Sequence, residues 1–286
     1  MLDQHPTSHW IDARGLKLHV RSWGSSDAPP LLLLHGWMDC ADSWQFVIES
    51  LQKNWYVIAP DQRGFGLSEQ QASGYWFPDY LADLEQVLLE LVGDQPVNLV
   101  GHSLGGNVCS LYAGVRPERV RRLVSVEGFG LPFIESDSAP ERYAKWLDQL
   151  QSPPTLKSYE DFSGLERRLQ RNDTFLSAER AQRLARAWGE ERNGKVVIRG
   201  DANHKLTYPV LYRLEEAMAC WRNITAPTLW VAGKQSIWVK MFESDSFAER
   251  KGCFQTLAEE WLDQAGHMVH HDQPEALAAL IEQHCE

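Results

Sequence analysis

A serine stands between a strand-like run and a helix-like run in the stretch NLVGHSLGGNV, residues 98–108. The stretch contains a GxSxG motif, with Ser103 between Gly101 and Gly105. Glycines permit a sharp strand-to-helix turn because they have no Cβ atom to collide across it. The N–H groups at the start of the following helix would also attract a developing negative charge. We therefore expect Ser103 to be a nucleophile rather than an ordinary exposed serine of a packing turn.

Short apolar runs alternate with helix-period segments on both sides of this turn. The strand-like runs include PPLLLLHG, WYVIAPDQRG, PVNLVGHS and VRRLVSVEG. Within residues 78–93, Leu81, Leu84, Leu88 and Leu91 recur at steps of three and four, as one buried helix face requires. This alternation predicts an α/β fold with a mostly parallel, doubly wound sheet that helices cover on both faces.

The pattern changes between residues 129 and 223, where charged helical stretches such as SAERAQRLARAWGEER replace the strand signals. The alternation returns with APTLWVAGK and ends in the helix-like segment QPEALAALIEQHCE. We therefore predict one core domain made of residues 1–128 and 224–286. A mostly helical cap, or lid, over residues 129–223 would interrupt it after the sixth strand.

Four segments resemble motifs of the α/β-hydrolase fold family, and they occur in the family's order. They are HGW at 35–37, DQRGFGLS at 61–68, GHSLG at 101–105 and AGHMVHHDQPE at 265–275. The resemblance covers nearly everything outside the predicted cap and implies the α/β-hydrolase fold. It also implies that the backbone N–H groups of Trp37 and Leu104 form an oxyanion hole, and that His267 is the base that activates Ser103.

The chain has ten histidines, and their places between the strand-like and helix-like runs suggest different roles for them. His267 follows a strand-like run and a glycine, in a loop where a base could face the nucleophile. His267 and His271 also have the i, i+4 spacing of metal ligands, but no HExxH motif or acidic third ligand accompanies them. We therefore predict no metal site. We expect His270 and His271 to be solvated, and His35 and His102 to shape the site.

A serine–histidine pair needs a third group that orients the imidazole. In many members of the family an aspartate follows the seventh strand, but here the segment is AGKQSIW and Ser236 occupies that position. The run VRRLVSVEG places Glu127 at the end of the sixth strand, and such strand ends border the ligand crevice of an open sheet. This placement resembles that in haloalkane dehalogenases with the acid after strand six, although their nucleophile is an aspartate. We predict Glu127 as the acid, with Asp263, Asp245 or no acid as alternatives.

The twelve tryptophans are an unusually large number for this length. Trp76, Trp146, Trp188 and Trp238 lie in segments expected to frame or cap the pocket, where aromatic area binds apolar groups. Packing in the core or cap explains such residues equally well. We therefore expect one or two of the four to bind substrate.

Composition argues against several classes of partner. The formal net charge of −11 would repel nucleic acids and anionic membranes. Five scattered cysteines favour reduced thiols, and the sequence shows no export or anchoring segment, so we expect a cytoplasmic location. The chain lacks GxxxxGK[ST], and GFGLSE lacks the third glycine of a dinucleotide fingerprint, so no cofactor is predicted.

Two functions fit this pattern. The first is a serine hydrolase that cleaves a small carboxylic ester or related acyl substrate through Ser103, His267, Glu127 and an acyl-enzyme intermediate. Thioesters, lactones and activated C–C bonds suit the same groups. The second is a ligand-binding or regulatory protein that keeps the fold but turns over slowly or not at all. The absent acid after the seventh strand motivates it, because fold does not fix function.

Overall fold

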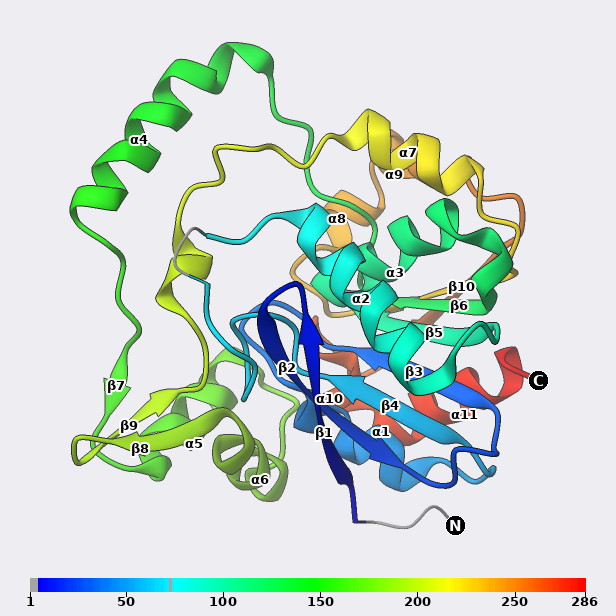
Figure 1. Cartoon of the computed structure of the whole chain (residues 1–286), viewed down its shortest axis with the longest axis horizontal. Coiled ribbons are helices and arrows are strands. Elements are labelled where there is room, and N and C mark those ends of the chain that lie inside the picture. Colours follow the sequence, from blue (N-terminus) through cyan, green and yellow to red (C-terminus); the bar gives the residue numbers. More distant parts are fainter. Residues whose placement is uncertain (1–4, 72–73) are drawn as a thin grey trace.

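An eight-stranded sheet forms the centre of the molecule in the computed structural model, which describes residues 5–71 and 74–286 (Figure 1). The strand order is β1-β2-β4-β3-β5-β6-β10-β11. The strands are β1 (Thr7–Ala13), β2 (Leu16–Trp23), β3 (Pro30–Leu34), β4 (Tyr56–Pro60), β5 (Val97–His102), β6 (Val120–Val126), β10 (Thr228–Gly233) and β11 (Leu257–Leu262). The pairs β1–β2 and β2–β4 are antiparallel, and the other neighbours are parallel. The mostly parallel α/β sheet predicted from the sequence is confirmed.

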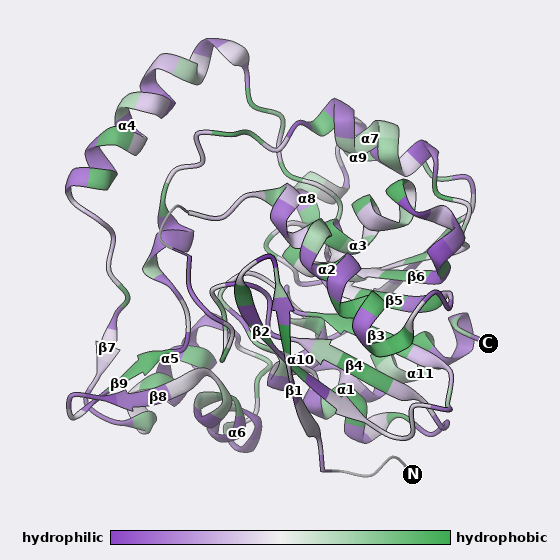
Figure 2. Ribbon diagram, in the orientation of Figure 1, coloured by the Kyte–Doolittle hydropathy of each residue, from purple (hydrophilic) through white to green (hydrophobic). Residues whose placement is uncertain are grey.

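Helices cover both faces of the sheet because its inner strands are apolar on both sides. All five residues of β3 are buried, with Leu32 and Leu34 in one apolar core and Leu31 and Leu33 in the other. In Figure 2 the hydrophobic colour is concentrated on these central strands. The first core lies under α2 (Phe77–Val92), α3 (Leu104–Val115) and α7 (Leu214–Arg222), and the second under α1 (Gln45–Ser50) and α11 (Pro274–His284).

The helix predicted over residues 78–93 forms as α2 and packs as its leucine spacing indicates. Leu84 and Leu88 are buried in the first core, and Leu81 and Leu91 pack against it. The remaining elements of this part of the chain are η1 (Ala41–Trp44), η2 (Pro117–Arg119), α8 (Val239–Phe242), α9 (Asp245–Lys251) and α10 (Val269–Asp272). Within residues 5–71 and 74–286, none of the helices combines the length and the apolar character needed to cross a bilayer.

The segment between β6 and α7 contains a small sheet that the sequence did not predict. Its elements are η3 (Ser136–Ser138), α4 (Ala139–Gln151), β7 (Ser158–Tyr159), α5 (Phe162–Asn172), α6 (Ala178–Trp188), β8 (Gly189–Arg192), β9 (Lys195–Ile198) and η4 (Ala202–Lys205). The strands pair in the order β7-β9-β8. Asn193 and Gly194, with φ of 54° and 73°, form the two-residue turn between β8 and β9. The expectation of a mostly helical segment missed this sheet because β7 has only two residues and β8 reads GEER, so the strand signal of β9, KVVI, had no partner in the sequence pattern.

Two parts of this segment pack differently. Residues of α5, α6 and β9 share an apolar cluster with Phe46 of α1, so this part has a core of its own at the side of the main sheet. By contrast, α7 contributes Met218 and the fully buried Trp221 to the first core of the main sheet. The proposed cap boundary at residue 223 therefore includes one helix that packs as a core helix. The action of residues 129–223 as a cap stays a prediction.

A carboxyl pair joins this segment to the loop that carries His267. Asp173 follows α5, and Asp272 is the last residue of α10. The Gly266 N–H donates to Asp272 Oδ2 at 2.7 Å. Burial and the negative charge of Asp173 raise the pKa of the Asp272 carboxyl from 3.8 to about 8. Because its pKa is higher in the folded state, the proton on Asp272 stabilises the fold, and this stabilisation is lost as the pH rises toward 8.

We predict that Asp173→Asn makes the free energy of unfolding less sensitive to pH between about 4 and 8. Removing the neighbouring negative charge brings the pKa of Asp272 closer to its usual value, so the variant gains stability relative to the wild type as the pH rises. Denaturant unfolding at a series of pH values measures this. Asp137→Asn, an exposed residue of the same segment, is the matched control. Parallel pH curves for wild type and Asp173→Asn would show that the pair does not titrate in this way.

Candidate active site

Ser103 occupies the turn between β5 and α3, where its backbone has φ 51° and ψ −111°. Its N–H donates to the carbonyl of Val126 at 2.8 Å, which links the turn to β6. A Cβ atom at Gly101 would lie 2.3 Å from the Gly105 oxygen, and one at Gly105 would lie 2.3 Å from the Leu34 oxygen. The turn therefore requires glycine at both positions, and it presents Ser103 at the carboxyl edge of the sheet.

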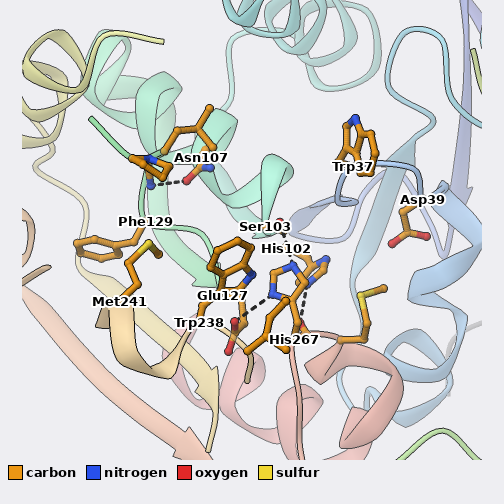
Figure 3. A pocket seen from close by; sticks show the side chains of 15 residues that line it. Trp37, Asp39, His102, Ser103, Asn107, Glu127, Phe129, Trp238, Met241 and His267 are labelled. Atoms are coloured by element: carbon orange, nitrogen blue, oxygen red, sulfur yellow. Dashed lines mark hydrogen bonds and ion pairs between the residues drawn. The ribbon is translucent and has the colours of Figure 1, made fainter. Parts of the chain in front are cut away.

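His267 lies on the loop between β11 and α10 and points toward Ser103 (Figure 3). Its Nε2 atom is 3.2 Å from Ser103 Oγ. Its Nδ1 atom is 3.0 Å from Glu127 Oε2. The backbone carbonyl of His267 accepts a hydrogen bond of 2.8 Å from His102 Nε2, so the end of β5 also holds the loop in place.

Glu127 directly follows β6, with a positive φ of 56° and a side chain that is completely buried. Its Oε2 atom accepts hydrogen bonds from His267 Nδ1 at 3.0 Å and from Ser236 Oγ at 2.7 Å. Its Oε1 atom accepts from the Gly233 N–H at 2.9 Å. Three donors thus compensate for the burial of this carboxylate. The same contacts hold the imidazole with Nε2 toward Ser103.

The two other acids considered from the sequence lie elsewhere. Asp263 Oδ2 is 2.9 Å from Lys234 Nζ, and its side chain is 74% exposed. Asp245 is an exposed residue in the first turn of α9. Among the described residues, Glu127 is the carboxylate that hydrogen-bonds His267.

Ser236 also contacts the site, although the sequence did not predict this contact. It stands where many family members have the aspartate, and here its hydroxyl donates to Glu127 Oε2. Its side chain is buried, so the hydrogen bond is shielded from water. The serine in place of the usual aspartate was the one feature of the sequence that could have indicated this contact.

The two residues predicted to form an oxyanion hole flank Ser103. Leu104 is the first residue of α3, where backbone N–H groups have no partner within the helix. A Cβ atom at Gly36 would lie 3.4 Å from the Cβ atom of Ser103, so the loop that continues into Trp37 passes close to the serine. Trp37 is 48% exposed, and its indole N–H donates to the His204 carbonyl at 3.4 Å.

The charged residues of the DQRGFGLS segment brace loops. The buried Asp61 carboxylate accepts hydrogen bonds from the backbone of Ala41 and Leu67 and lies 2.8 Å from His19 Nδ1. Arg63 forms an ion pair with the buried Asp83 of α2. Asp61 and Arg63 therefore form ion pairs and hydrogen bonds inside the protein, and they do not line the cavity beside Ser103.

A cavity of about 360 Å³ opens in front of Ser103, His267 and Glu127. Its wall is largely apolar and includes Phe129, Leu131, Pro132, Ile237, Trp238 and Met241. A second cavity of about 420 Å³ shares Ile237, His267 and Met268 with the first. The two cavities therefore meet at the His267 loop.

The four tryptophans considered from the sequence separate into two groups. Trp238 lines the cavity beside Ser103, and its ring centroid is 6.3 Å from that of His267. Trp188 lines the second cavity and donates from Nε1 to Ser43 Oγ at 2.8 Å. Trp76 precedes α2 and Trp146 lies on α4, and neither lines these two cavities.

His270 and His271 are buried, so the expectation that they are solvated was wrong. Their exposed fractions are 0% and 2%, because α10 packs against α1 and η1. The ring of His270 lies 4.9 Å from that of Trp44 between centroids. Burial lowers the pKa of His102 and of His271 well below the usual 6.5, which keeps both rings neutral.

Asp39 lies next to these rings and carries a charge. Burial alone would raise the pKa of its carboxyl, but the interaction with His270 lowers that pKa to about 2. Asp39 also lines the cavity beside Ser103.

A family model described as the alpha/beta hydrolase fold matches residues 29–274 of the chain. The chain belongs to the α/β-hydrolase fold family. A serine hydrolase-like protein of Danio rerio is 26% identical over 287 residues, which cover 95% of this chain and 84% of that protein. The solved thioesterase domain from the curacin biosynthetic pathway is 28% identical, with a TM-score of 0.87 over 97% of this chain and 99% of that domain. An esterase of Mycobacterium tuberculosis shares the fold at 24% identity, with a TM-score of 0.75 over 97% of this chain and 91% of its own. The family and its serine hydrolase-like and thioesterase relatives indicate a hydrolase.

We predict that Gly105→Ala destabilises this member of the α/β-hydrolase family by roughly 3 kcal/mol. The added methyl group would lie 2.3 Å from the Leu34 backbone oxygen, which no side-chain rotation relieves. Gly200→Ala is the control, because the nearest atoms to its added methyl group are 3.8 Å away. Thermal and denaturant unfolding of both variants measure the effect. Equal stabilities would contradict the close approach described for this turn.

Proposed function

We propose that the protein is a serine-dependent hydrolase that cleaves a small carboxylic ester or a related acyl compound, as carboxylesterases do. The observation that carries this proposal is the line of hydrogen bonds from Glu127 through His267 to Ser103, at the wall of an apolar cavity. The arrangement has the three roles of a serine–histidine–acid triad. The competing idea of a non-catalytic binding protein rested on an absent acid, and Glu127 offers a carboxylate at hydrogen-bond distance.

In the first half of the reaction, Ser103 Oγ attacks the carbonyl carbon of the substrate while His267 Nε2 takes the serine proton. The Glu127 carboxylate stabilises the imidazolium that forms, and Ser236 and Gly233 keep that carboxylate in place. The backbone N–H groups of Trp37 and Leu104 hold the negative oxygen of the tetrahedral intermediate. His267 then gives its proton to the leaving oxygen, and the acyl group stays on Ser103.

In the second half, His267 removes a proton from a water molecule, which attacks the acyl-enzyme. The carboxylic acid leaves, and the proton returns to Ser103. These steps require no metal ion or organic cofactor.

The cavity favours an uncharged apolar acyl substrate of small to moderate size. Its apolar wall suits alkyl or aromatic groups, and among the described residues no lysine or arginine lines it that could pair with an anionic substrate. Trp238 is the best candidate of the four tryptophans for direct substrate contact, and Trp188 for contact with a group that extends into the second cavity. Residues 129–223 would act as the lid over this site and exclude bulk water.

We also propose a cytoplasmic location and no nucleic-acid or membrane partner. The five cysteines form no disulfide bond, which suits a reducing compartment. The net charge of −11 disfavours polyanionic partners.

We predict that Ser103→Ala lowers the kcat for p-nitrophenyl ester hydrolysis by about 10⁶-fold, because it removes the nucleophile. The measurement compares esters from acetate to decanoate, and the preferred chain length reports the size of the acyl cavity. Ser136→Ala, at an exposed serine, is the control and should keep full activity. A fluorophosphonate probe should label the wild type and fail to label Ser103→Ala. If wild type and Ser103→Ala are equally inert toward both esters and probe, the non-catalytic binding function takes the place of this proposal.

We predict that Glu127→Gln lowers kcat by about 10³- to 10⁴-fold while the protein stays folded. All three groups that contact the carboxylate are hydrogen-bond donors, so the NH₂ end of an amide must face a donor. This favours the wrong imidazole tautomer. Steady-state kinetics measure kcat, and circular dichroism checks the fold. A kcat close to that of the wild type would exclude Glu127 as the triad acid.

A second experiment tests whether a carboxylate at position 236, where many family members have an aspartate, can replace Glu127. Adding Ser236→Asp to Glu127→Gln places a carboxylate where many relatives have one, and we expect it to recover at least ~10-fold of the lost kcat. The matched control is Glu127→Gln with Ser236→Asn, which has the same size without the charge. Equal rates for the two double variants would mean that the position cannot supply the acid in this chain.

A further inference from the structure

Three buried side chains that can ligate a metal meet beside the cavity in front of Ser103. Asp39 lies in the loop between β3 and η1, and His270 and His271 are neighbours in α10. They are 3%, 0% and 2% exposed. One possible ligand atom from each residue lies within 4.8 Å of the other two. Only the fold brings these residues together, because Asp39 is distant from the two histidines in sequence.

Most of the polar atoms in this cluster have no hydrogen-bond partner among the described residues. These atoms are Asp39 Oδ2, both ring nitrogens of His270, and His271 Nε2. The ion-pair distance from His270 Nε2 to Asp39 Oδ2 is 3.4 Å, longer than a normal N–H···O hydrogen bond. Buried polar atoms without partners destabilise a fold. A group that binds several of these atoms at once would therefore be favoured here.

The spacing suits a tetrahedral metal ion. Zn²⁺ holds nitrogen and oxygen ligands at about 2.0–2.2 Å, which places two ligand atoms about 3.4 Å apart. The Asp39 and His270 atoms already have this separation. The ligand atoms of the whole set lie within 4.8 Å of one another, so those that are farther apart than 3.4 Å would move closer on binding one ion. One carboxylate oxygen and two imidazole nitrogens favour Zn²⁺, Co²⁺ or Cu²⁺ over Mg²⁺ and Ca²⁺, which prefer oxygen ligands.

Neighbouring groups hold the Asp39 carboxylate in an orientation suitable for binding. Its Oδ1 atom accepts hydrogen bonds from the Cys40 N–H at 2.8 Å and from the Ser43 hydroxyl. Trp188 Nε1 in turn donates to Ser43 Oγ at 2.8 Å. Such outer contacts fix a ligating carboxylate and strengthen metal sites. They leave Oδ2 as the oxygen that faces His270.

An ion could reach this cluster from the cavities. Asp39 lines the cavity in front of Ser103, and His271 lines the second one. Figure 3 shows Asp39 at the edge of the first cavity, on the other side of the His102 and His267 rings from Glu127. A water molecule from a cavity could complete the coordination.

We propose that Asp39, His270 and His271 bind one divalent transition-metal ion of the Zn²⁺ class. The site is separate from the hydrogen bonds of the candidate active site, because His267 uses its ring nitrogens toward Ser103 and Glu127. The sequence predicted no metal site, because no acidic third ligand accompanied the spacing of His267 and His271. The third ligand, Asp39, comes from a different loop.

The test is titration of the full chain, freed of metals with a chelator, with Co²⁺ followed by its visible d–d absorption. We expect one ion per chain, with absorption typical of tetrahedral coordination, displaced by Zn²⁺ and unaffected by Mg²⁺. His270→Gln and His271→Gln should each weaken binding at least about tenfold. His9→Gln, which changes a histidine of β1, should bind as the wild type does.

Buried histidine variants can fail to fold, so the second measurement uses the wild type alone. Zn²⁺ should raise its unfolding temperature, and Mg²⁺ at the same concentration should not. Binding that is lost in His267→Gln but kept in His270→Gln and His271→Gln would place the ion at the candidate active site and overturn the proposal. Absence of one-to-one Co²⁺ binding, together with no thermal shift from Zn²⁺, would overturn it as well. Neither readout depends on ester hydrolysis.

Discussion

The buried carboxylate of Glu127 is the group on which the arrangement of the site depends. A charge without access to water is tolerated only if donors surround it, and here the donors come from Gly233, Ser236 and His267. These residues belong to the end of β10, the loop after it, and the loop after β11. Together with Glu127 itself, the contact joins the connections that follow the neighbouring strands β6, β10 and β11. It also sets the direction in which the imidazole faces Ser103.

Parallel pairing explains why these loops meet. The strands β5, β6, β10 and β11 are neighbours in that order and run in the same direction, so their carboxyl ends lie along one edge. Ser103 follows β5 and Glu127 follows β6, each with a positive φ that turns the chain sharply. The Ser103 N–H bonds to Val126, so the two turns are also linked directly. The apolar runs that form the strands thus place polar side chains where each run ends.

The segment between β6 and α7 also packs against the elements around the site. Its small sheet and helices pack against α1 and η1, which brings Trp188 to Ser43 and Asp173 to the His267 loop. Ser43 in turn donates to Asp39, which belongs to the buried cluster with His270 and His271. Imidazoles, carboxylates and indoles are therefore concentrated around one loop, most of them shielded from water. Electrostatic interactions among them are stronger than they would be on the surface.

The sequence by itself determined the sheet, the order of its helices and the turn at Ser103. Apolar runs, leucine spacing and glycines act over short distances, so their consequences can be read locally. It also ranked Glu127 first among possible acids, because a strand end has a predictable position at the sheet edge. Three results depended on the tertiary structure: the contact of Glu127 with His267 and Ser236, the burial of His270 and His271, and the sheet of β7, β8 and β9. In each case residues far apart in sequence meet, and no local pattern encodes the distance or the solvent exposure that results.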